Sequence, residues 1–108
     1  MNDLSKPLKG LLGKKVEKVD QAVNYVNIKF FAGGDLTIYN AVTMIQPVGE
    51  NIEAIENSRI TQIIENPNYL EIYFDNGTAF TVSLSFDPSV GIESMQLVMP
   101  GEAIVVWN

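Results

Sequence analysis

The alternation of apolar and polar residues between Tyr69 and Leu84 predicts a β-hairpin. Apolar side chains occupy every second position on both sides of the turn sequence Asp75-Asn76-Gly77: Leu70, Ile72, Phe74, Phe80, Val82 and Leu84. A period of two is that of strands with one buried face. A three-residue loop places both apolar sets on the same face, whereas a two-residue loop would put them on opposite faces. We therefore expect Ile72 to face Phe80 and Gly77 to take a left-handed conformation.

The same pattern occurs 44 residues earlier, which predicts an internal repeat of residues 14–40 and 58–84. In the first copy the loop is Phe31-Ala32-Gly33, and Lys29 is expected opposite Asp35. Any two β-hairpins share some of this pattern. Three identical residues outside the core favour a duplicated unit instead, at positions 24, 25 and 37 and again at 68, 69 and 81.

Other segments complete a mainly β fold. We expect a first strand over 14–20 with Val16 and Val19 inward, and a strand over 42–46. A short helix is expected near 4–12, and residues 50–57 fit either a short helix or an edge turn. Residues 86–91 are expected to form a loop, and residues 93–107 a C-terminal hairpin that turns at Pro100-Gly101. The prediction is one domain, 1–108, of roughly eight to ten strands in two duplicated units, packed as a sandwich or barrel.

Charge narrows the range of partners. The net charge is −6, but residues 1–20 carry +2 and the remaining 88 residues carry −8. An acidic body repels phosphate, so nucleic acid is not an expected partner, while a basic protein is. The chain has no apolar run long enough to span a bilayer and no apolar segment typical of a signal peptide. We therefore expect a soluble cytoplasmic protein that does not bind membranes.

Catalytic groups are scarce. The chain has no cysteine and no histidine, so thiolate chemistry and the commonest general base and metal ligand are absent. Gly33-Gly34 fits a turn better than a phosphate-binding loop. Glu50, Glu53 and Glu56 lack the spacing of a calcium loop and are expected to form a solvated acidic face. We expect no enzyme activity, no cofactor and no metal.

Aromatic side chains provide the binding candidates. The predicted register places Tyr25 opposite Tyr39 on the outer face of the first hairpin, and Tyr69 and Tyr73 on that of the second. Tyrosines among small polar residues are typical of recognition surfaces. The alternative is that they pack beneath the terminal strands. Phe31, at a loop tip, is either tucked against a neighbour or offered to a partner.

The C-terminal hairpin is apolar on both predicted faces. One face carries Met95, Leu97, Met99, Ile104 and Val106, and the other carries Val98, Ala103, Val105 and Trp107. A strand that is apolar on both faces needs a cover on each. We expect a homodimer, with Val98, Val105 and Trp107 as interface candidates. If the two halves close over the hairpin instead, Trp107 belongs to the core.

The motif Leu-x-Gly-x-x-Val-x-x-Val over 11–19 is followed by Val-x-Ile-x-Phe-x-x-Gly-x-x-Leu-x-Ile-Tyr-Asn over 26–40. It resembles small bacterial two-repeat β domains of uncharacterised function, some similar to immunity proteins of toxin systems. The resemblance implies a fold and transfers no site residues. The expected function is a non-catalytic protein-binding module, of which an immunity-type inhibitor is one form. The alternatives are a small-ligand-binding domain with a tyrosine-lined pocket and a structural homo-oligomer.

Overall fold

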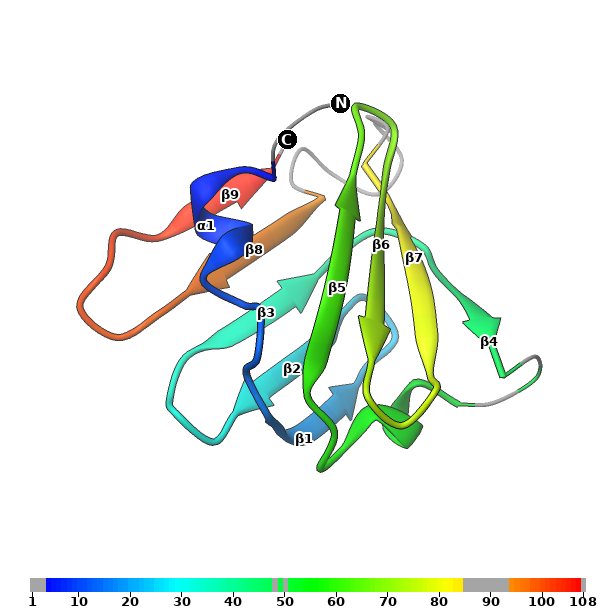
Figure 1. Ribbon diagram of the computed structural model, residues 1–108. Helices are drawn as coiled ribbons and strands as arrows, with labels where there is room; N and C mark the ends of the chain where they lie inside the picture. The colour runs from blue at the N-terminus through cyan, green and yellow to red at the C-terminus, as the bar shows by residue number, and fades with distance from the viewer. Residues whose placement is uncertain (1–3, 48, 50, 85–93, 108) are drawn as a thin grey trace.

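The computed structural model describes residues 4–47, 49, 51–84 and 94–107, and over these residues it confirms a mainly β, sandwich-like fold. Two antiparallel sheets contain the nine strands of the described part (Figure 1). The five-stranded sheet has the order β1-β2-β3-β8-β9, with β1 Val16–Gln21, β2 Val26–Phe30, β3 Asp35–Ile38, β8 Met95–Val98 and β9 Val105–Trp107. The four-stranded sheet has the order β4-β7-β6-β5, with β4 Val42–Gln46, β5 Ile60–Glu65, β6 Tyr69–Phe74 and β7 Ala79–Ser83.

Both predicted hairpins form with the predicted register. Ile72 pairs with Phe80 in β6–β7, and Ile28 pairs with Leu36 in β2–β3. Gly77 and Gly33 have φ angles of 88° and 97°, as three-residue loops of this kind require. The burial of one face therefore selected the loop length in both hairpins.

The strand that precedes each hairpin contains a bulge at the same place. The pairing of β1 with β2 shifts between Val16 and Lys18, and that of β5 with β6 shifts between Ile60 and Gln62. A bulge inserts one residue, so two side chains three positions apart can point to the same face. This explains why Val16 and Val19 are both buried, as expected from the sequence.

The two halves meet at an isolated bridge between Lys15 and Arg59, which are 44 residues apart. The amide of Val16 donates to the carbonyl of Ser58, and the amide of Ile60 donates to that of Lys14. The two hydrogen bonds are equivalent, because Val16 corresponds to Ile60 and Lys14 corresponds to Ser58 at the offset of 44. The bridge therefore lies on a local twofold relation between the halves. Gene duplication as its origin stays a prediction.

The fourth strand of each sheet comes from the other half of the chain. After β3 the chain crosses to the second sheet, where β4 pairs with β7, and after β7 it returns to the first sheet, where β8 pairs with β3. Val42 lies opposite Val82, and Met95 lies opposite Ile38, which is the equivalent of Val82. Val42 and Met95 are therefore equivalent positions. This exchange joins the halves into one domain.

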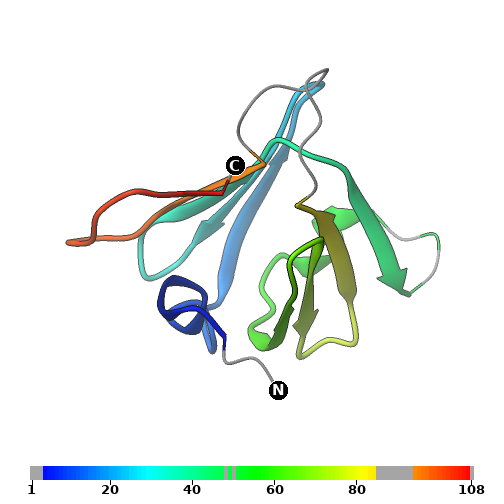
Figure 2. The same ribbon diagram turned by 90° about the horizontal axis from the view of Figure 1, so that it is seen from above.

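The core lies between the sheets, with short helical segments at its margins. Figure 2 shows the two sheets spreading apart, with helix α1 (Lys6–Lys9) beside the β8–β9 hairpin. The 3-10 helix η1 (Ile52–Ile55) precedes β5. The largest fully buried side chains include Phe80, Leu8, Leu11, Ile28, Leu36, Ile38, Ile55, Leu70, Ile72 and Met95.

The faces predicted for the C-terminal hairpin are wrong. Trp107 pairs with Met95 and Val105 pairs with Leu97, so all four side chains share the core face. Val106 pairs with Gln96 and is 41% exposed. Pro100-Gly101 does form the expected turn, closed by a hydrogen bond from the Glu102 amide to the Met99 carbonyl. Because β9 begins only at Val105, the longer connection changes which residues of the two strands face each other.

Candidate protein-binding face

The four tyrosines lie outside the core of the sandwich. Tyr25 and Tyr69, equivalent residues of the two halves, are 42% and 41% exposed, and Tyr39 and Tyr73 are half-buried. Strands β8 and β9 extend the five-stranded sheet at its edge, and of the four tyrosines Tyr39 contacts them, through a hydrogen bond of 3.3 Å that its hydroxyl donates to Gln96 of β8. The register aligns Tyr25 with Tyr39 one position beyond the last described pair, Val26 with Ile38. The two outer faces differ in their other residues.

The outer face of the five-stranded sheet holds a closed polar network. Lys29 Nζ donates to Asp20 Oδ2 at 3.1 Å and to Asn27 Oδ1 at 2.7 Å, and Asn27 donates to Thr37 at 2.9 Å. The hydrogen bond from Lys29 holds the pKa of Asp20 below its ordinary value. Asp35 lies opposite Lys29 as predicted, but the described ion pairs of Lys29 involve only Asp20 on the other neighbouring strand. The groups on this face are largely satisfied by each other.

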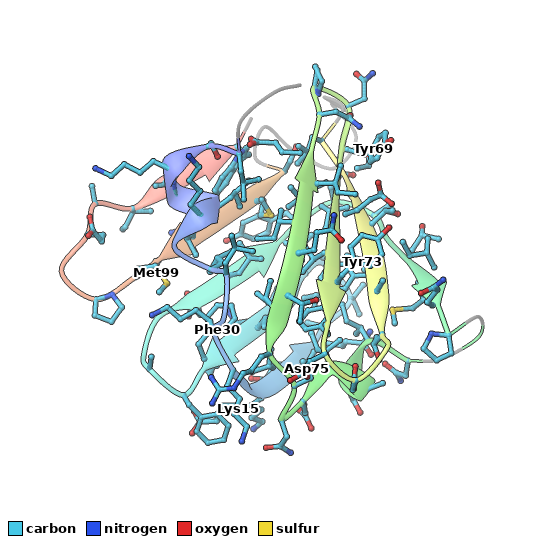
Figure 3. The ribbon with its side chains drawn as sticks, viewed as in Figure 1. Lys15, Phe30, Tyr69, Tyr73, Asp75 and Met99 are labelled. Atoms are coloured by element: carbon cyan, nitrogen blue, oxygen red, sulfur yellow. The ribbon has the colours of Figure 1, made fainter. Side chains whose placement is uncertain are left out.

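The outer face of the four-stranded sheet is different, since the described residues that line its hollow offer tyrosine, carboxylate, amide and hydroxyl groups but no lysine or arginine. Figure 3 shows Tyr69 and Tyr73 projecting from β6. A shallow hollow of about 430 Å³ lies on this face and is lined by Ala41, Thr43, Asn68, Tyr69, Glu71, Thr81 and Ser83. Glu71 Oε1 accepts a hydrogen bond of 2.9 Å from the Tyr73 hydroxyl. Among the described ion pairs none involves Glu71.

The hydrogen bond to Glu71 raises the pKa of Tyr73, with desolvation as the second cause. A raised pKa stabilises the fold below the unfolded-state pKa of about 10, and this contribution is lost as the pH rises through the folded-state value. We expect Glu71→Gln to lower the pKa of Tyr73, since it removes the negative charge. Tyrosine ring NMR shifts followed from pH 8 to 12 measure the change. An unchanged Tyr73 titration would show that the two groups are not coupled in solution.

Phe31 is 54% exposed, and the Lys15 ammonium lies 5.4 Å from the centre of its ring. It is therefore not tucked into the core. The equivalent residue of the second half, Asp75, uses its carboxylate to accept a hydrogen bond from the Arg59 amide at 3.0 Å. The backbone is the same in both places, because the amides of Phe31 and Asp75 donate to the carbonyls of Lys15 and Arg59. Each loop tip is thus held near the bridge between the halves.

The remaining predicted sites have clear positions. Val105 and Trp107 pack against the core, and Val98 is half-buried opposite Asp35. A role for these three residues in a homodimer stays a prediction. Ile52–Ile55 forms the short helix, where Glu53 is exposed, while Glu56 accepts a hydrogen bond of 2.8 Å from the Val19 amide. Glu56 is therefore structural rather than part of a freely solvated face. The expected loop at 86–91 lies outside the described residues, as does Glu50.

One further equivalence was missed in the sequence. Leu8 and Leu11 match Ile52 and Ile55 at the same offset of 44, and all four are buried. The amide of Lys14 bonds to the carbonyl of Leu11 as that of Ser58 does to Ile55. The match of Leu8 with Ile52 and of Leu11 with Ile55 is present in the sequence. It was not recognised because the segments of α1 and η1 were each interpreted from their own local pattern. The correspondence between the two halves therefore extends to the residues before each first strand.

These features define a two-sheet antiparallel β protein with tyrosines on both outer faces. The tyrosine-bearing face of the four-stranded sheet, which carries Tyr69 and Tyr73, is covered by no described strand or helix. No protein-family model, curated protein or solved structure matches the chain. Among the described residues, histidine, cysteine and acidic side chains form no group of three that could hold a metal ion. Within the same residues, no helix has the length and apolar character needed to cross a membrane.

Proposed function

We propose that the protein is a non-catalytic binding module that engages a protein partner through the outer face of its four-stranded sheet. The observation that carries the proposal is the set of Tyr69, Glu71 and Tyr73 on a face that no described strand or helix covers. Tyrosine supplies contact area with a polar tip and is enriched among the residues that dominate binding energy. The flat surface supports a protein ligand better than a small molecule, which needs a more enclosed site.

Charge indicates what the partner presents. Glu71 has a hydrogen-bonded tyrosine beside it but no described ion-pair partner, so a lysine or arginine of a bound protein could pair with it. The net charge of −6 would accelerate association with a basic surface. Inhibition of a basic toxin, as the resemblance to immunity proteins implies, is the narrower form of this proposal. It requires the same face to block the partner's own site.

The test compares two exposed aromatic residues, one on the proposed face and one outside it. Tyr69→Ala should reduce the affinity for the partner at least tenfold, since interface tyrosines commonly contribute more than about 1.4 kcal/mol. Phe31→Ala is the control, because Phe31 is an aromatic residue that is 54% exposed and does not line the hollow on this face. The measurement is quantitative capture of proteins from an extract of the source organism by wild type and both variants. A partner that all three proteins capture equally would contradict the proposal.

A further inference from the structure

A second site lies at the edge of β4, where the two halves of the molecule differ. In the five-stranded sheet, the fourth strand β8 is followed by β9, which pairs with it along Met95, Gln96 and Leu97. In the four-stranded sheet, the equivalent strand β4 is an edge strand. Figure 1 shows β4 at the end of its sheet, with β7 as its described neighbour. The position that β9 occupies in one half is therefore empty of any described strand in the other.

The hydrogen-bonding groups of this edge can be assigned from the register. The Ser83 amide donates to the Ala41 carbonyl, so the alternation of an antiparallel pair directs Ala41 and Thr43 toward β7. The amides and carbonyls of Val42 and Met44 then point away from the sheet. Their equivalents Met95 and Leu97 point toward β9, where they pair with Trp107 and Val105. Two backbone positions of β4 are thus oriented for a further strand.

A cleft accompanies the open edge. It has a volume of about 880 Å³ and is lined by Gln21, Ala22, Val23, Asn24, Tyr25, Val26, Ile38, Tyr39, Asn40, Ala41, Val42, Met44, Gly49, Asn51 and Ile52. None of the lining residues that the structure describes is charged, although the chain as a whole has 19% charged residues. An uncharged lining matches an uncharged ligand, because burying an unpaired charge is costly.

The five-stranded sheet shows which element occupies the position that corresponds to this cleft. There, Pro7 and Gly10 of the α1 region line a hollow together with Leu97 and Val105. In the cleft beside β4, Asn51 is the equivalent of Pro7, and Met44 is the equivalent of Leu97. The relation between the halves thus places the cleft where β9 would lie if the second half had one.

We propose that the edge of β4 and its cleft bind an extended, uncharged segment of a partner protein by β-strand addition. The segment would pair antiparallel with Val42 and Met44 and place alternate apolar side chains in the cleft, as Val105 and Trp107 are placed beside β8. Main-chain hydrogen bonds supply affinity in this mode, and the side chains that enter the cleft supply specificity. The linings of this cleft and of the hollow on the tyrosine-bearing face share Ala41, but the proposal does not depend on the function of that face.

The chain's own β9 provides the test ligand, a synthetic peptide of residues 103–107 that is blocked at both ends and therefore carries no charge. Added to the full-length protein, it should shift the NMR amide signals of Val42, Met44 and the cleft residues, and slow the hydrogen exchange of the Val42 and Met44 amides at least tenfold. N-methylation of the peptide at Val105 should abolish these effects, because that amide would face β4. N-methylation at Val106, whose amide faces away, should preserve them.

A variant of the protein gives an independent comparison. Met44→Pro removes an outward-facing amide, which edge strands tolerate, so the protein should remain folded and bind the peptide at least tenfold more weakly. Four outcomes would overturn the proposal: no shifts, shifts confined to β8 and β9, equal effects of both N-methylated peptides, or Val42 and Met44 amides already protected in a dimer of the protein alone. The last outcome would make a second copy the occupant. Tyr69→Ala should bind the peptide as tightly as the wild type does. Loss of peptide binding in Met44→Pro but not in Tyr69→Ala distinguishes this site from the proposed protein-binding face.

Discussion

Alanine in place of Gly34 is expected to destabilise the fold by about 2–5 kcal/mol. Gly34 has a φ of 86°, and an added Cβ would lie 2.5 Å from the Val98 carbonyl oxygen and 2.9 Å from Met99 Sδ. The left-handed conformation costs an L-residue about 1–2 kcal/mol, and overpacking adds about 1–3 kcal/mol. The loss arises because the β2–β3 loop lies directly against the end of β8. Urea unfolding followed by circular dichroism measures it.

Gly77→Ala is the control for the conformational part of this effect. Gly77 has a φ of 88°, but an added Cβ would meet no atom within 4 Å. The expected loss is therefore about 1–2 kcal/mol, from the backbone alone. Equal losses at Gly34 and Gly77 would mean that the β2–β3 loop does not contact β8 as closely as the structure shows.

Phe80→Ala is expected to cost about 3–5 kcal/mol, which is a large part of the stability of a domain of this size. Phe80 is fully buried, its ring centre lies 5.7 Å from that of Phe74, and it pairs with Met44 of the exchanged strand. Removing the ring leaves a cavity in the core and weakens the contact between the halves. Phe31→Ala, at an exposed loop tip, should change stability by less than about 0.5 kcal/mol. A Phe80→Ala loss below about 1 kcal/mol would contradict the described core.

The hairpins could be predicted from the sequence because one buried face allows only one loop length. Pairing Ile72 with Phe80 follows from residue parity alone. The spacing of Val16 and Val19 also contained the bulge, since two inward residues three apart require one extra residue between them. At these positions the local sequence pattern and the burial of one sheet face determine the same strand register.

The exchange of fourth strands could not be predicted in the same way. The pattern of Val42–Gln46 identifies a strand but not its neighbour, and β4 fits the edge of β3 or of β7 equally well by local criteria. The predicted faces of the C-terminal hairpin were wrong for a related reason. The turn at Pro100-Gly101 does not determine where β9 begins, so the residues that pair across the hairpin could not be assigned. The exposure of Tyr69 depended on this topology, since only the placement of β8 and β9 decides which face they leave uncovered.

The exchange of fourth strands is the claim on which both proposed sites depend, and NMR contacts between α-protons test it most directly. In an antiparallel sheet, residues opposite each other without mutual hydrogen bonds bring their α-protons close together. The structure predicts strong contacts between Val42 and Val82 and between Ile38 and Met95. Contacts between residues 36–38 and 42–46 in their place would show that β4 pairs with β3, and would contradict the account.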